Sequence, residues 1–444
     1  MSGYQGSQLT SEIVSAAVAS FNQFIVEIPP ENRLDTMNII PHIDSLHIVI
    51  DQCLSTERLF QVQGIAEKFK NLGEICRIHC EFVVGKKYVE HCLAIQQRLL
   101  GVNHVDVAAS YTALSSIYKD LWDLEEAKDY QQKALEIEIE KLGGEHVTVA
   151  KSYIKLAKIF MELDDLAQAK EYQQRALEIQ IETLGGEHVT VAKSYSNLAV
   201  IFMKLDDLAQ AEEYQQRARA IKIKKYGMEH MLGAGHVSVA KSYGILALIN
   251  KDLGDLEQAK DYQQRALAIK LEKLGTEHVS VAKSYCNLGL IHKDLGDLER
   301  AMEYQQRALD IKLKKFGAEN VSVATSYSNF ALIYMDLGDF AQAKEYQRRA
   351  LTVEIKLKKL GPEYVSVATS YSNLSSIYKD FGDFEQAEVC QQRALAIKLK
   401  KLGAEHDSVA TSYSHLASIH QGLVDFEQFK KYHQLALAIK LKKL

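Results

Sequence analysis

Apolar and small residues recur along the chain with the spacing of one helix face. Counted from Tyr285, they stand at the anchor position and three, four and seven places later, at Leu288, Gly289 and His292. This spacing predicts a helix with one buried stripe. The pair Gly296-Asp297 follows, which is typical of a helix stop and the N-cap of a second helix. The pattern therefore predicts two helices joined by a short turn, here called helix A and helix B.

Helix B is marked by alanines seven residues apart, which is two turns on one face. They are Ala127/Ala134, Ala169/Ala176, Ala259/Ala266 and Ala343/Ala350. Small residues at these places allow neighbouring helices to approach closely.

The two-helix pattern repeats through most of the 444 residues. A Ser-Tyr pair marks eight clear copies, with tyrosines at Tyr111, Tyr153, Tyr195, Tyr243, Tyr285, Tyr327, Tyr371 and Tyr413. Most spacings are 42 residues, and insertions near Met228–Gly235 and in 353–361 account for the longer ones. Residues 71–101 align as a degenerate ninth copy, with Phe69 at the tyrosine position. We expect a repeat array over 66–444, preceded by a helical N-terminal segment over 1–65, a possible remnant linker.

Helix pairs that stack in one direction form an α-solenoid. The unit resembles the tetratricopeptide repeat, and its length together with Leu-Gly-x-x-His between copies most resembles kinesin light chains and nephrocystin-3-like proteins. Examples are Leu142–His146 and Leu274–His278. The resemblance implies an all-α, right-handed α-solenoid superhelix of tetratricopeptide helix pairs. It also implies that helix A lines a concave groove that binds extended peptide.

The segment 1–65 leaves two alternatives open. Pro29, Pro30 and Pro41 interrupt it, so it offers no sustained heptad like the coiled coil of kinesin light chains. Glu31–Leu46 resembles the helical stretch before the repeats of NACHT or NB-ARC receptors, although the sequence contains no P-loop. The chain could thus be a cargo-adaptor fragment related to kinesin light chain, or the repeat arm of such a receptor lacking its NTPase.

Composition narrows the function classes further. The net charge of −5 argues against a nucleic-acid partner. No window is apolar enough for a membrane span, and the N-terminus lacks the order of a secretory signal, so we expect a cytoplasmic protein without a membrane partner. Six scattered cysteines predict reduced thiols.

Histidines and cysteines are interpreted as structural. Equivalent histidines stand in the turns before helix A, at His104, His146, His188, His236, His278 and His406. Packed helices lie ~8–10 Å apart, too far for successive histidines to share one ion. The cluster of Cys76, His79, Cys80, His91 and Cys92 lacks two close ligand pairs, and Cys92 and Cys390 stand at core positions. We expect no metal, no cofactor and no catalytic site, so not an enzyme.

The face of helix A opposite the buried stripe carries the candidate binding residues. Two places before the tyrosine stand Lys151, Lys193, Lys241 and Lys283. Two places after it stand Asn197, Asn287, Asn329 and Asn373. Nine places after it the residues are mostly acidic, as at Asp294 and Asp336. Lysine early and aspartate late in a helix oppose the helix dipole, so ion pairs between helices or a ligand must offset that cost.

These rows predict a non-enzymatic scaffold for protein interactions. Asparagines carry donors and an acceptor that suit the backbone of an extended peptide, and the lysines favour an acidic one. The alternative is a solvated helix face, which charge runs usually are.

Two further expectations concern single places. Trp122 replaces the helix-stopping glycine, so we expect its helix to end differently or its indole to pack over the first copy. The last copy carries Phe426, Phe429, Leu435 and Leu437, which predicts self-association through an uncapped C-terminal repeat.

Overall fold

The structure is a computed structural model that describes residues 59–78, 82–227, 236–356 and 365–441. Within these ranges the chain forms eighteen helices and no strand, which confirms the all-α prediction. Residues 1–58, the insertion Met228–Gly235 and the end of the 353–361 insertion lie outside the described residues, so the expectations placed on them stay predictions.

Each copy contributes one helix A and one helix B. The A helices are α4 (Leu59–Ile78), α6 (Val105–Asp120), α8 (Val147–Glu162), α10 (Val189–Lys204), α12 (Val237–Asp252), α14 (Val279–Asp294), α16 (Val321–Asp336), α18 (Val365–Asp380) and α20 (Asp407–Gly422). The B helices are α5 (Phe82–Leu100), α7 (Leu124–Leu142), α9 (Leu166–Leu184), α11 (Leu208–Gly227), α13 (Leu256–Leu274), α15 (Leu298–Phe316), α17 (Phe340–Lys356), α19 (Phe384–Leu402) and α21 (Phe426–Leu441).

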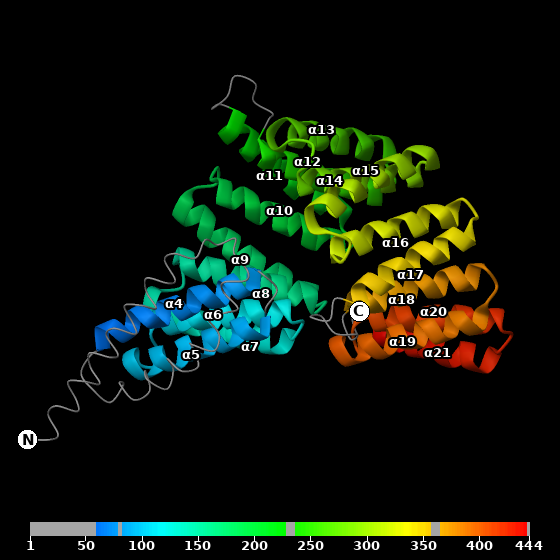
Figure 1. The fold of residues 1–444 in the computed structure, drawn as a ribbon. Coiled ribbons are helices and arrows are strands. Elements are labelled where there is room, and N and C mark those ends of the chain that lie inside the picture. Colours follow the sequence, from blue (N-terminus) through cyan, green and yellow to red (C-terminus); the bar gives the residue numbers. More distant parts are fainter. Residues whose placement is uncertain (1–58, 79–81, 228–235, 357–364, 442–444) are drawn as a thin grey trace, which may run out of the picture. The chain divides into compact units, whose positions relative to one another are not determined.

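The chain divides into two compact units, residues 1–159 and 160–444. In the first unit α4 packs on α5, α5 on α6, and α6 on α7 (Figure 1). In the second unit the consecutive helices from α9 to α21 pack in the same way. Each unit is therefore built as a solenoid of helix pairs, and the degenerate first copy forms such a pair despite its divergence.

The core consists of the residues that the repeat pattern selected. Tyr285, Leu288 and His292 are buried, and the paired alanines of helix B have no exposed surface. Because alanine leaves the two helix axes close together, each helix B can pack between two A helices. Cys92 and Cys390 are buried in this core, as predicted, and the described cysteines are free thiols.

The repeated histidines are helix N-caps. The Nδ1 atom of His278 accepts a hydrogen bond of 3.0 Å from the backbone N–H of Ser280, and the same bond is made by His104, His146, His188, His236 and His406. Asn320 caps its helix with Oδ1 in the same way. The predicted structural role of the histidines at the turn into helix A is confirmed.

The expectation that Trp122 ends its helix differently is wrong. Trp122 adopts the left-handed conformation with φ 61°, and its N–H donates to Lys119 O as the N–H of Gly254 does to Lys251 O. The N–H of the following residue closes the turn both in the copy with Trp122 and in copies with glycine, as from Asp123 to Tyr118 O and from Asp297 to His292 O. These bonds impose the turn on whichever residue stands there, and a non-glycine residue bears the strain. The indole is half-buried.

Val424 offers a test of this strain, because it holds φ 60° with a side chain that is 68% exposed. Val424→Gly is expected to raise the free energy of unfolding by about 1 kcal/mol, since a β-branched residue is costly in the left-handed region. Val102 is 61% exposed and has no positive φ, so Val102→Gly is the control and should destabilise. Chemical denaturation checks both, and a less stable Val424→Gly protein would contradict the strain.

Helix α21 presents apolar side chains to solvent. Phe426, Leu435 and Leu437 are exposed, and Phe429 is half-buried. This surface agrees with the predicted uncovered face, while self-association stays a prediction. Among the described helices, none combines the length and the apolar character that crossing a bilayer requires.

Candidate functional site

The candidate lysines lie exposed on consecutive A helices. In the second unit Lys193, Lys241 and Lys283 lie on α10, α12 and α14, and in the first unit Lys151 lies on α8. None of these lysines has a carboxylate within ion-pair distance among the described residues. We call the helix A positions two before and two, five and nine after the anchor tyrosine the groove face.

Three of the candidate asparagines are tied to the preceding helix B. The Nδ2 atom of Asn197 donates to Gln173 Oε1 at 3.2 Å, that of Asn287 to Gln263 Oε1 at 3.4 Å, and that of Asn329 to Gln305 Oε1 at 3.2 Å. Asn373 makes no such bond within the described part of the chain. The Oδ1 atoms of all four accept no hydrogen bond from described residues, so they are left for a ligand.

The glutamines in these bonds join successive copies. Gln263 and Gln305 are fully buried. Gln263 Nε2 donates to the backbone carbonyl of Ser284 on the next helix A, whereas Gln305 Nε2 donates to that of Cys286 on helix A of its own copy. The asparagine row is therefore part of the interface between copies as well as of the groove face. The sequence pattern did not reveal this second role, because the glutamine and the asparagine lie 24 residues apart.

Two aspartates of the acidic row nine places after the tyrosine are paired with lysines of the preceding helix A. Lys251 Nζ lies 2.8 Å from Asp294 Oδ2, and Lys293 Nζ lies 3.1 Å from Asp336 Oδ2. Each pair joins one helix A to the next. Ion pairs between helices thus offset the unfavourable dipole position of these aspartates. The lysines at the helix starts receive no such offset.

A row of polar residues in helix B, overlooked in the sequence, is buried beneath the groove face. At one position of successive copies stand Gln96, Glu138, Gln180, Lys222, Lys270, Lys312, Glu354 and Lys398. The lysines bond the serine before the next tyrosine, as Lys270 Nζ does to Ser284 Oγ at 2.7 Å. Aligning the copies would have exposed this row, because its members share the 42-residue register.

These buried lysines carry no acidic partner. Burial, helped by the positive charges of Lys241 and Lys193, lowers the pKa of Lys222 to about 8. Burial and the charges of Lys283 and Lys241 lower the pKa of Lys270 to about 8 as well. The exposed lysines of the groove face therefore lie close enough to the buried ones to repel them, and this part of the second unit holds concentrated positive charge.

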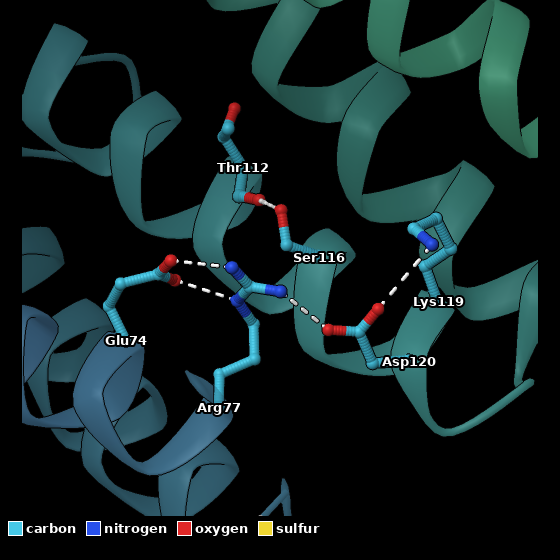
Figure 2. Close-up of polar contacts among 6 residues, drawn as sticks. All are labelled: Glu74, Arg77, Thr112, Ser116, Lys119 and Asp120. Atoms are coloured by element: carbon cyan, nitrogen blue, oxygen red, sulfur yellow. Dashed lines mark hydrogen bonds and ion pairs between the residues drawn. The ribbon is translucent and has the colours of Figure 1, made fainter. Parts of the chain in front are cut away.

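The first unit contains a polar cluster on the same face (Figure 2). Arg77 of α4 lies between two carboxylates, with Nη2 2.6 Å from Glu74 Oε1 and Nη1 2.6 Å from Asp120 Oδ2. Lys119 Nζ lies 3.4 Å from the other oxygen of Asp120. The hydrogen bond from Arg77 lowers the pKa of Glu74, so this carboxyl group stays ionised. Arg77 was absent from the predicted site.

No metal-binding group is present in the ranges that the structure describes, where no three histidine, cysteine, aspartate or glutamate side chains gather around one point. His79 and Cys80 of the Cys/His cluster lie outside those ranges.

The comparison with known families agrees with the fold and the repeat. The model of the tetratricopeptide repeat matches residues 64–140, 148–224, 238–314, 322–400 and 366–442. The chain therefore belongs to the tetratricopeptide repeat family, and its fold is an all-α solenoid of tetratricopeptide helix pairs. No curated protein matches this chain.

Solved structures share the architecture. TPR-like repeats described as kinesin light chain from Podosopora anserina are 24% identical, with a TM-score of 0.41, and the match covers 48% of this chain and 97% of theirs. A Rap protein complexed with competence and sporulation factor is 15% identical, with a TM-score of 0.55 over 88% of this chain and 99% of its own. Aspartyl phosphate phosphatase F from Bacillus subtilis is 13% identical, with a TM-score of 0.50 over 88% and 95%. All three are less than 25% identical to this chain, and the two with a TM-score of 0.50 or more show the fold alone.

Proposed function

We propose that the protein is a non-enzymatic interaction scaffold that binds extended, acidic peptide segments along the groove face of its A helices. Lys193, Lys241 and Lys283 attract the acidic side chains, and the Oδ1 atoms of Asn197, Asn287, Asn329 and Asn373 accept hydrogen bonds from the peptide backbone. Lys151 plays the same part on the first unit. We assign the units to the 42-residue kinesin light chain and nephrocystin-3-like type.

The observation that carries this proposal is the contrast between two charged rows on one face. Asp294 and Asp336 are paired with lysines of the adjacent helix, while Lys241 and Lys283 have no carboxylate partner in the described residues. The repulsion between these lysines and the buried Lys270 disfavours the free state. An anionic ligand reduces that repulsion, and half-exposed apolar residues such as Leu248 lie between the lysine and aspartate rows.

The triple change Lys193→Gln, Lys241→Gln and Lys283→Gln tests this proposal. Since the three side chains are exposed and make no ion pair, we expect an unchanged fold and at least about tenfold weaker binding of an acidic peptide. The probe is a fluorescent peptide selected on the intact protein from a random-peptide display library. Binding is measured by fluorescence anisotropy, and the loss should shrink at high salt.

The matched control removes the same charge from the B helices. Lys87, Lys315 and Lys430 are exposed lysines of α5, α15 and α21, and their glutamine substitution should leave the affinity within about twofold. Equal losses in both triple variants would show a non-specific charge effect and contradict the groove assignment.

Asn373 allows a clean test of the asparagine row. Asn287→Ala or Asn329→Ala would strand a buried glutamine oxygen, at about 1–3 kcal/mol of stability. Asn373→Ala breaks no such bond, so melting should stay constant while peptide affinity falls about two- to tenfold, the effect of one hydrogen bond. Unaltered affinity would remove this row from the proposed site.

Whether this chain belongs to a larger protein, and to which kind, stays a prediction. The proposed groove face is compatible with an adaptor fragment related to kinesin light chain and with a receptor arm that lacks its NTPase. A cytoplasmic location and self-association through α21 likewise rest on the sequence expectations.

A further inference from the structure

A pocket of about 460 Å³ opens on the groove face of the first unit. Its walls come from the three A helices α4, α6 and α8. Five cationic side chains and one carboxylate line it, namely Lys70, Arg77, Lys119, Lys155, Lys158 and Glu74. The proposed binding of acidic peptide by Lys193, Lys241 and Lys283 does not use this pocket.

The carboxylates near the pocket are already engaged. Glu74 receives two hydrogen bonds from Arg77, from Nε at 2.8 Å and Nη2 at 2.6 Å, and Asp120 receives one from Nη1 at 2.6 Å (Figure 2). Lys119 is also paired with Asp120. The acidic groups therefore neutralise the cations on one side of the pocket, around α4 and the end of α6.

The other three lysines that line the pocket, two on α8 and one on α4, lack such partners. Lys155, Lys158 and Lys70 have no carboxylate within ion-pair distance among the residues that the structure describes. Lys155 is half-buried, and this burial lowers the pKa of its amine. The charges of Glu74 and Glu138 counteract this lowering in part, and those of Arg77 and Lys158 add to it. A charged amine in this position is costly until an anion approaches it.

The arrangement favours a ligand with more than one negative charge. One carboxylate would neutralise a single lysine, whereas a phosphate monoester carries about −1.5 to −2 charges and three acceptor oxygens. Lys70 lies on α4, and Lys155 and Lys158 lie on α8, so amines border the pocket from two sides. Several acceptor oxygens on one small group can meet amines from both sides.

We propose that this pocket binds the phosphate group of a phosphorylated side chain in the protein segment that occupies the groove face. The inference rests on the proposed peptide-binding function and specifies what the first unit recognises. Lys155, Lys158 and Lys70 contact the phosphate oxygens, and Arg77 holds Glu74 and Asp120 away from them.

The test uses the full chain and three blocked amino acids as probes. These are N-acetyl phosphoserine methylamide and its serine and glutamate counterparts, titrated by NMR of ¹³C-labelled lysine side chains. We expect saturable binding of the phosphoserine probe, at least about tenfold tighter than glutamate and with no measurable binding of serine. Lys155→Met should weaken phosphoserine binding at least about tenfold.

Two further variants keep the result unambiguous. Lys158→Gln changes an exposed side chain and should weaken binding without affecting the fold, while Lys315→Met removes an equal charge on α15 and should have no effect. Phosphoserine binding that equals glutamate binding, or that survives both pocket substitutions, overturns the proposal. So does an equal loss in Lys315→Met.

Failure here and failure of the proposed function give different results. If the phosphoserine test fails but the selected acidic peptide loses affinity in the triple lysine variant of the second unit, the phosphate site is refuted and the scaffold function is retained. If neither variant set affects its ligand, both fall.

Discussion

Replacing both Lys222 and Lys270 by methionine is expected to raise the free energy of unfolding at pH 7 by about 2–4 kcal/mol. Both amines are buried without an acidic partner, and burial lowers each pKa from 10.5 to about 8. This lowering of the pKa corresponds to a loss of about 3 kcal/mol in the free energy of unfolding for each protonated lysine. Losing the hydrogen bonds from Lys222 to Ser196 and Ser242 and from Lys270 to Ser284 removes about 1 kcal/mol each from the gain.

The pH dependence distinguishes this explanation from a general packing effect. Below pH 8 both lysines are protonated in the folded and unfolded states, so the wild type bears the full cost. Between pH 8 and 10.5 the folded state loses its protons first, and wild-type stability therefore rises relative to the variant. Above pH 10.5 both states are neutral and the cost is gone.

Urea denaturation of the full chain at pH 7, 9 and 10.5 measures the difference. Lys315→Met serves as the control, since this lysine is exposed and its substitution should give a small difference at every pH. If the double variant is less stable than the wild type at pH 7, or if its gain in stability does not change with pH, the burial of charged lysines is not the cause.

Gly85→Val is expected to destabilise the first helix pair by about 3 kcal/mol. A Cβ atom at Gly85 would lie 2.9 Å from the carbonyl oxygen of Gly73 and 3.2 Å from the Cβ of Cys76. The first contact is with backbone, so α4 and α5 must move apart rather than a side chain turn aside. Most other copies have alanine or serine at these positions, as at Ala127 and Ser115.

Hydrogen exchange is the measurement, because a terminal helix pair of a solenoid can open without the rest. Amides of α4 and α5 should exchange about a hundredfold faster, while those of the second unit keep their rates. Gly144→Val is the matched control, since a Cβ there meets nothing within 4 Å. Protection in α4 and α5 equal to the wild type would show that the close approach is not required.

The same substitution also separates fold from binding site. Helix α4 supplies Lys70, Glu74 and Arg77 to the pocket of the first unit. Opening of α4 should therefore abolish phosphoserine binding, whereas the acidic peptide of the second unit should bind as before.

Much of the fold could be predicted because its signals are local. The stripe at Tyr285, Leu288 and His292 and the stop at Gly296 lie within a few residues of one another, and their repetition identifies each copy. Trp122 shows the limit of this reasoning. Its side chain argues against a left-handed turn, but the hydrogen bonds of the turn, made from Trp122 and Asp123 back to α6, prevail.

The candidate binding face was only partly predictable. The rows of lysine and asparagine were visible in the sequence, and their placement on the A helices follows from the 3.6-residue period. That Asn329 already donates to Gln305 was not visible, since the partner belongs to another copy. The pocket of the first unit was hidden for the same reason, because Lys70 and Lys155 lie far apart in the chain.

The sequence by itself determined the helix pairs, their ends and the register in which they stack, because periodicity, capping residues and small residues act over a single copy. Only the tertiary structure decided which charges are neutralised. Asp294 and Lys251 meet because neighbouring A helices bring positions 43 residues apart together, whereas Lys270 reaches a serine between two helices and no carboxylate. Charge pairing is a property of contacts between copies, and in the second unit those contacts leave Lys193, Lys241 and Lys283 without a carboxylate partner among the described residues, although the whole chain carries a net charge of −5.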